Sequence, residues 1–120
     1  MYKIYFYKDS RGHQPIKEYI LELAAKQDKS SRIKLNKIQE YMEVLQANGT
    51  RAGIPYVKHL DGKIWELRPL SDRILFAAWV DDKIILLHHF TKKTQKTPSR
   101  EVEQAKRNLK AFLERTDLDE

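Results

Sequence analysis

Cysteine is absent from this chain of 120 residues. Its absence excludes disulfides, thiolate metal sites and cysteine nucleophiles together. Apolar runs are short, and none approaches the roughly 20 residues that cross a membrane as a helix. Residues 1–7 have the pattern of a strand and not the cationic, apolar and cleavage regions of a signal peptide. We therefore expect a cytoplasmic protein that makes no membrane contact.

Glycine is scarce, and the ligand patterns of metal sites are missing. The four glycines cannot supply a dinucleotide-binding fingerprint or a phosphate-binding Walker loop. His88 and His89 are adjacent on an expected strand, so their side chains point to opposite faces and cannot easily bind one metal. The expected sheet has only Glu66 as a carboxylate outside its turns, whereas metal-dependent nucleases need a carboxylate cluster. We expect neither a metal nor another cofactor.

Positive charge is in excess, with 23 Lys and Arg against 17 Asp and Glu. Such an excess favours nucleic acid or an acidic protein as partner, although a lysine-rich solvated surface has the same composition. Its distribution is uneven, because residues 84–100 contain four Lys or Arg and no Asp or Glu. Residues 114–120 are net acidic. The positive charge is therefore concentrated where the expected strands end.

The middle of the chain predicts four consecutive strands, at about Ile54–Leu60, Lys63–Pro69, Arg73–Asp81 and Lys83–Phe90. Asp61-Gly62, between the first two, is a strong signal for a β-hairpin. The other connections are just as short, and a parallel pair would need a crossover of about a dozen residues. We therefore predict an antiparallel meander sheet.

Helices are predicted on both sides of the meander. A first strand, Tyr2–Tyr7, is followed by a helix from Pro15 to about Lys26, with apolar residues at helical spacing. A second helix, capped by Ser30 or Ser31, ends before Asn48-Gly49 and completes an αα-hairpin. A final helix opens at Thr97-Pro98 and runs to about Leu113. The prediction is one α+β domain over residues 1–120, in the order βααββββα.

Cationic side chains are expected to converge at one edge of this sheet. Strand alternation puts Glu66 and Arg68 on one face, and Arg73 begins the next strand across a tight turn. Lys92 and Lys93 follow the last strand. Metal-free cleavage of RNA by its own 2′-hydroxyl needs a proton acceptor, a proton donor and positive charge around the phosphorane. Arginine suits the last task, and a lysine with a lowered pKa, or Glu66, suits the first.

Each of these side chains also has a purely structural interpretation. Glu66 and Arg68 can form a simple ion pair, and Arg73 can be a charge that discourages aggregation at a sheet edge. The lysines of residues 92–96 are equally typical of a solvated loop. Phe90 is the aromatic residue best placed to stack on a base. Spacing and charge therefore indicate phosphate binding and leave cleavage open.

Three segments carry a family resemblance: Lys58–Arg68, Arg73–Phe76 and His88–Pro98. They resemble the HigB-type, phage-derived branch of the RelE/ParE toxin superfamily, and the likeness spans essentially the whole chain. The basic block Lys-Lys-Thr-Gln-Lys-Thr-Pro, at 92–98, is its most distinctive part. The resemblance implies a RelE-like fold.

The resemblance also implies a function. Members are toxins of type II toxin–antitoxin systems, and this branch implies a ribosome-dependent mRNA endonuclease (mRNA interferase) that needs no metal and inhibits translation. A cognate HigA-like helix-turn-helix antitoxin is expected to neutralise the toxin in a heteromeric complex. The complex is expected to bind operator DNA through the antitoxin.

The resemblance carries over to particular residues. Arg73 matches the strand-start arginine that binds phosphate, whereas Lys92 and Lys93 match the basic residues after the last strand only loosely. Glu66 and Arg68 belong to the shared motif, and their share in catalysis is open. The side chains expected to contact RNA or the ribosome without reading sequence are Lys58, Phe90, Lys96 and Arg100.

Two alternatives remain open at this stage. A ParE-like inhibitor of DNA gyrase shares the fold and needs no cluster that cleaves phosphodiesters. A non-catalytic nucleic-acid-binding module would bind with a steep salt dependence and leave RNA intact.

Overall fold

The computed structural model describes the backbone of residues 1–119 and the side chains of residues 1–115. The elements are β1 (Lys3–Phe6), α1 (Pro15–Ala25), α2 (Lys29–Asn48), the 3₁₀ helix η1 (Gly49–Ala52), β2 (Val57–Asp61), β3 (Ile64–Leu67), β4 (Asp72–Trp79), β5 (Lys83–Thr91) and α3 (Ser99–Asp119). The predicted α+β class and the order βααββββα are confirmed, with η1 as an addition. No helix in this described part of the chain has the length and hydropathy of a membrane span.

The sheet has the strand order β1-β5-β4-β3-β2. Strands β2 to β5 form the predicted antiparallel meander. β1 pairs with β5 in parallel, with Lys3 opposite Lys83, which the meander prediction did not include. A parallel partner is possible here because the two helices of the hairpin lie between β1 and the meander and supply a long crossover.

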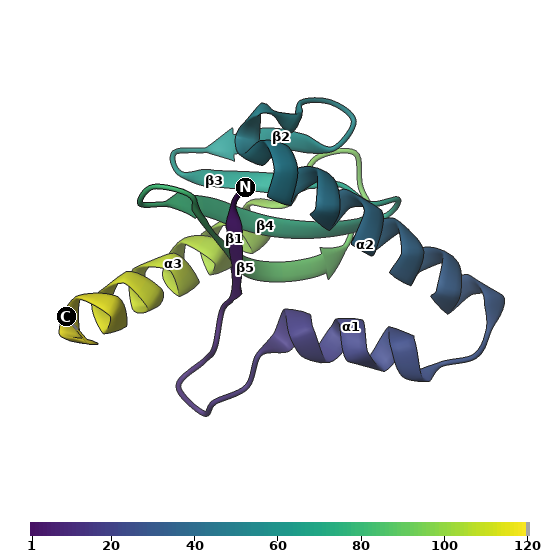
Figure 1. Ribbon diagram of the computed structural model, residues 1–120, viewed down its shortest axis with the longest axis horizontal. Coiled ribbons are helices and arrows are strands. Elements are labelled where there is room, and N and C mark those ends of the chain that lie inside the picture. The colour runs from purple at the N-terminus through teal and green to yellow at the C-terminus, as the bar shows by residue number, and fades with distance from the viewer. Residues whose placement is uncertain (120) are drawn as a thin grey trace.

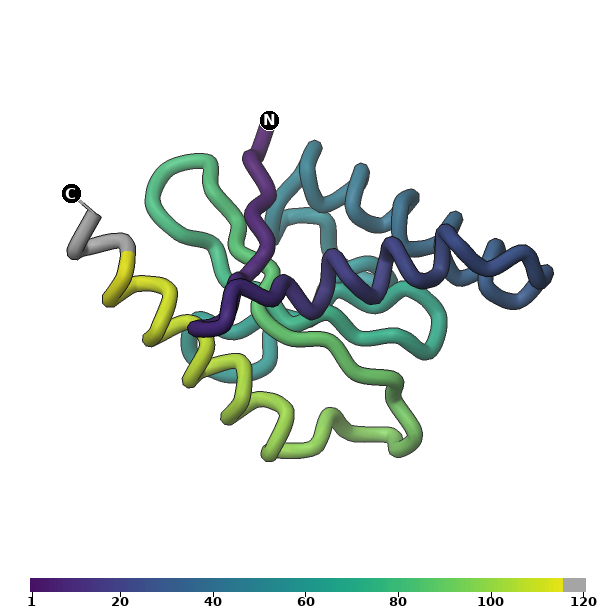
Figure 2. The backbone as a smooth tube through the Cα atoms, turned by 90° about the horizontal axis from the view of Figure 1, so that it is seen from below, coloured from purple at the N-terminus to yellow at the C-terminus, as the bar shows by residue number. Residues whose placement is uncertain are grey.

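The two faces of the sheet carry separate apolar cores. α1 and α2 cover one face and α3 covers the other (Figure 1 and Figure 2). The hairpin-side core contains Ile16, Leu23, Ile38, Leu45, Val57, Leu67, Ile74, Phe76, Ile84 and Leu86. The α3-side core contains Ile64, Leu75, Ala77, Ile85, Leu87 and Ala105. β4 and β5 are covered on both faces, so their consecutive residues, and not only alternate ones, are apolar.

Several predicted boundaries were wrong, among them those of α2, α3 and β2. α2 is capped by Asp28, not by Ser30 or Ser31: the Asp28 carboxylate accepts hydrogen bonds from the amide and the hydroxyl of Ser31, both at 2.9 Å. A carboxylate in this position also faces the positive end of the helix dipole. The final helix starts at Ser99 and extends to Asp119, past Leu113, because no glycine or proline interrupts it.

β2 starts at Val57, later than predicted, because residues 53–57 form a tight turn. The amides of Tyr56 and Val57 both donate to the carbonyl of Gly53, at 2.9 Å. These bonds commit the amides of Tyr56 and Val57 to the turn, whereas the carbonyl of Tyr56 still accepts from the amide of Arg68 at 2.9 Å.

A bulge in β5 sets the directions of the two histidines. Leu87 has no partner in the β4 register, and its carbonyl accepts a hydrogen bond from the Asn108 side chain of α3 at 2.8 Å. The next residue, His88, contacts Glu101 of α3, whereas His89 contacts Asp72 on the hairpin side. The predicted opposite directions of the histidines are confirmed.

Candidate active site

The candidate active site lies where the start of β4 meets the end of β5. Arg73 is paired with Phe90, and Asp72 with Thr91, so the residues after β5 emerge beside Arg73. Arg73 lies two residues before Leu75, which faces α3, and therefore projects from the same face of the sheet. The predicted approach of Arg73 to the end of the following strand is confirmed.

Glu66 is the centre of this group. Its side chain is only 1% exposed, and its Oε1 lies 3.4 Å from Nε of Arg68 and 3.6 Å from Nε of Arg73. Its Oε2 accepts a hydrogen bond from the hydroxyl of Thr97. Both carboxylate oxygens are therefore engaged, and one buried negative charge holds two guanidinium groups close together.

Arg73 is nearly buried and fixed by backbone carbonyls. Its Nη1 donates to the carbonyl of Leu70 at 2.6 Å and to that of Asp72 at 2.8 Å. Burial lowers the pKa of Arg73, and the positive charge of Arg68 lowers it further, against the opposing effect of Glu66. An arginine keeps its charge under such a shift. The fixed guanidinium is therefore a preorganised positive charge, of the kind that stabilises a phosphate.

Lys92 enters the site immediately after β5. Its amide donates to the carbonyl of Ser71 at 2.7 Å, which fixes the chain beside the turn between β3 and β4. Burial lowers the pKa of Lys92, and the positive charges of Arg73 and Arg68 lower it further, while Glu66 opposes the shift. At a given pH, a larger fraction of Lys92 is therefore neutral than of an ordinary lysine.

Two hollows meet at Lys92. A shallow one of about 670 Å³ is lined by Leu70, Ser71, Arg73, Lys92, Lys93 and Thr94. A smaller one of about 250 Å³ is lined by Lys58, His59, Leu60, Glu66, Lys92, Gln95, Lys96, Thr97 and Val102. Six of the side chains expected from the sequence to act on or bind RNA thus line one or both hollows: Lys58, Glu66, Arg73, Lys92, Lys93 and Lys96.

Two other predicted residues are placed differently. Arg100 is exposed in the first turn of α3 and forms no ion pair with the described side chains. Phe90 is partly buried and packs against the α3-side core, with its ring centroid 6.2 Å from that of His88. Only part of the Phe90 ring is therefore open to a base.

Behind Arg73, on the hairpin face, lies a partly buried polar cluster that the sequence did not predict. The Asp72 carboxylate accepts hydrogen bonds from Tyr19 at 3.0 Å and from Thr91 at 3.2 Å, and its Oδ1 lies 3.3 Å from Nε2 of His89. The rings of Tyr19 and His89 stack at 3.9 Å. The cluster fixes Asp72, whose carbonyl holds Arg73. In sequence, Asp72 is indistinguishable from a turn residue and Tyr19 from a core residue.

Two residues of this cluster, Asp72 and Tyr19, shift each other's pKa values. Burial pushes the pKa of Asp72 upward, but the hydrogen bond and charge of His89 and the hydrogen bond from Tyr19 outweigh it, so the pKa is lowered. Burial, followed by the charge of Asp72, raises the pKa of Tyr19. Asp72 is therefore held as a carboxylate and Tyr19 as a neutral donor.

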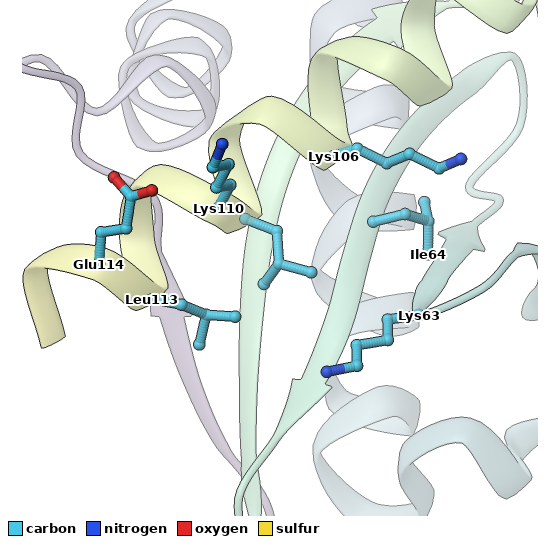
Figure 3. Close-up of a pocket in the computed structure, with 7 residues that line it drawn as sticks. Lys63, Ile64, Lys106, Lys110, Leu113 and Glu114 are labelled. Carbon is cyan, nitrogen blue, oxygen red and sulfur yellow. The ribbon is translucent and has the colours of Figure 1, made fainter. Parts of the chain in front are cut away.

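A more apolar hollow lies farther along β3, under α3 (Figure 3). It has a volume of about 390 Å³ and is lined by Lys63, Ile64, Lys106, Leu109, Lys110, Leu113 and Glu114. Lys106 is already paired with Asp61 at 2.5 Å. Neither Glu66 nor the arginines line this hollow, so we do not include it in the candidate active site.

A helical hairpin and a single C-terminal helix on opposite faces of a five-stranded sheet define a RelE-like α+β protein. The family model described as phage derived protein Gp49-like (DUF891) matches residues 18–110. The chain belongs to this family, which is part of the RelE/HigB-type toxin group. The matched segment includes every predicted site residue. The search of curated proteins gave no match.

Proposed function

We propose that this protein is the HigB-type toxin of a type II toxin–antitoxin system and a metal-independent, ribosome-dependent mRNA endonuclease. The observation that carries the proposal is the convergence of Arg68, Arg73 and Lys92 around the buried carboxylate of Glu66, beside an open hollow. We call the sheet edge that carries Arg68, Arg73, Lys92 and Lys93 the rim. Its positive charge suits the phosphates of an RNA backbone, whatever the nucleotide sequence. Membership of the Gp49-like family supports a toxin.

The reaction proposed for this rim is an internal transfer. The 2′-oxygen of the RNA forms a bond to the adjacent phosphorus, and the bond from phosphorus to the 5′-oxygen breaks. The products are a 2′,3′-cyclic phosphate and a free 5′-hydroxyl. Arg73 and Arg68 stabilise the charge that develops on the phosphorane oxygens. Neutral Lys92 accepts the proton of the 2′-hydroxyl, and the Lys93 ammonium protonates the leaving 5′-oxygen.

Lys92 suits the base better than Glu66 does. A base must come within about 3 Å of the proton that it removes. The Glu66 side chain is 1% exposed, and both of its oxygens are already engaged by Arg68, Arg73 and Thr97. Lys92 lines both hollows. Glu66 then acts by holding the arginines in place.

The base assignment predicts a particular pH dependence. Lys92→Met should lower single-turnover cleavage by about 10²- to 10⁴-fold, whereas Lys110→Met, a matched charge loss on α3, should leave it unchanged. Wild-type cleavage should rise with pH through the Lys92 pKa, which lies below the ordinary 10.5. Arg68→Gln removes a neighbouring positive charge that lowers the pKa of Lys92. The rising part of the pH–rate profile should therefore move to higher pH. A profile that stays in place would contradict this assignment.

The proposed partners follow from the same function. The toxin is expected to act in the cytoplasm, on messenger bound to ribosomes, and to form a complex with a HigA-like helix-turn-helix antitoxin. Operator DNA would be bound through the antitoxin. Copurification of the product of the adjacent open reading frame with this chain tests the complex directly.

Primer extension on a messenger is the decisive test of the proposed function. We expect new 5′ ends when the protein and translating ribosomes are both present, and no new ends without ribosomes. Treating the protein with a chelator, and removing the chelator before ribosomes are added, should have no effect. Intact messenger together with inhibited DNA supercoiling would select a gyrase inhibitor instead. Salt-dependent RNA binding without cleavage would select a non-catalytic binding module.

A further inference from the structure

The lysine-bearing segment 92–98 is attached to the sheet at both ends. At its start, the amide of Lys92 donates to the carbonyl of Ser71 at 2.7 Å. Near its end, the hydroxyl of Thr97 donates to Oε2 of Glu66. Between these points, the hydroxyl of Thr94 donates to the carbonyl of Lys96 at 2.7 Å, within the segment itself. Thr97 therefore supplies the side-chain attachment of the segment to β3.

We propose that Thr97 is a positioning residue that holds the lysine-bearing segment in register with the arginine pair. The two halves of the site share one carboxylate: Oε1 of Glu66 faces Arg68 and Arg73, and Oε2 binds Thr97. The inference rests on the proposed function, because it assigns Lys92 to proton transfer. In this proposal Thr97 acts through Glu66 and takes no part in proton transfer.

The attachment depends on the hydroxyl and on the stiffness of the threonine. Threonine is β-branched, so few χ1 rotamers are open to it and the direction of its hydroxyl is restricted. The following residue, Pro98, has no amide hydrogen that could replace the bond. Without the hydroxyl, a buried carboxylate oxygen loses its partner, and the segment is left with the bond of Lys92 to Ser71 at its start and the bonds of Pro98 to the first turn of α3 at its end.

Two substitutions separate the hydroxyl from the shape of the side chain. Thr97→Val keeps the branched shape and removes the donor, and Thr97→Ser keeps the donor. We expect Thr97→Val to lower kcat by about 10²-fold with little change in KM, the size of effect that a misplacement of about 1 Å has. Thr97→Ser keeps the donor and loses only the methyl group that restricts its direction, so it should lose much less kcat than Thr97→Val. Equal kcat for wild type and Thr97→Val, or equal losses in the two variants, would overturn the inference.

Hydrogen exchange at the Lys92 amide tests the attachment without any cleavage. In Thr97→Val this amide should exchange severalfold faster than in wild type, while amides of the β4–β5 ladder keep their rates. If the wild type cuts no RNA but the exchange rates differ as expected, the proposed function fails and the attachment stands. If the rates are equal, the positioning role is wrong, whatever the wild type does to RNA.

Discussion

Arg73→Ala is expected to restore growth to expressing cells and to lower messenger cleavage by at least about 10²- to 10³-fold, the usual cost of losing one preorganised group that stabilises transition-state charge. The guanidinium is held by the carbonyls of Leu70 and Asp72, so its position is fixed before RNA binds. The variant should stay folded, because Glu66 keeps Arg68 as an ionic partner. Primer extension and growth curves measure the two effects.

Controls separate the geometry of Arg73 from its charge. Arg73→Lys keeps the charge and loses the planar fork, so we expect activity between those of wild type and Arg73→Ala. Arg107→Ala removes an equal charge from an exposed position on α3 and should remain fully toxic. Binding of the antitoxin by Arg73→Ala confirms its fold. Full toxicity of a folded Arg73→Ala protein would place the active site elsewhere.

Glu66→Ala should cause the largest loss of stability, about 3–5 kcal/mol in the free energy of unfolding, because it leaves buried positive charge without compensation. Arg73 is almost as buried as Glu66, and both Arg68 and Arg73 face the same carboxylate oxygen. Urea unfolding at neutral pH measures the effect. Glu66→Gln keeps the shape of the side chain and the acceptor for Thr97, so its free energy of unfolding should fall by less.

The same pair of variants tests what Glu66 does. Arg68→Ala is the matched comparison, because Arg68 is partly exposed and its loss should cost less than that of Glu66. A Glu66→Ala protein within about 1 kcal/mol of wild type would show that the carboxylate does not hold the arginines together. If Glu66→Gln folded normally and hydrogen exchange around Arg73 were unchanged, a complete loss of cleavage would identify Glu66 as the base.

The parts of the fold that could be predicted from sequence depend on local signals. Asp61-Gly62 and the equally short later turns force neighbouring antiparallel strands, and a tight turn between β4 and β5 also fixes their register. That register alone would place Arg73 opposite His89, and the bulge at Leu87 moves it one residue, to Phe90. Turn lengths therefore predicted that Arg73 approaches the end of β5, but not the exact pairing, because the bulge has no sequence signal.

The parts that were missed depend on contacts between distant residues. Tyr19 and Asp72 are far apart in sequence, and no periodic pattern indicates that a helix tyrosine bonds a turn carboxylate. The bond from Thr97 to Glu66 likewise joins the segment before α3 to β3. The parallel pairing of β1 with β5 has no local signal either, because a lone strand can join either edge of a meander. Asp28, by contrast, was recognisable as a cap from its residue type.

The polar cluster under the helical hairpin means that Arg73 is supported from the opposite face of the sheet. Tyr19 and His89 hold the Asp72 carboxylate, and the Asp72 carbonyl holds Arg73. A change on α1 that moves Tyr19 is therefore passed through Asp72 to the guanidinium of Arg73. A partner protein that binds the helical hairpin would be able to inhibit the toxin by displacing Arg73, without covering the rim itself.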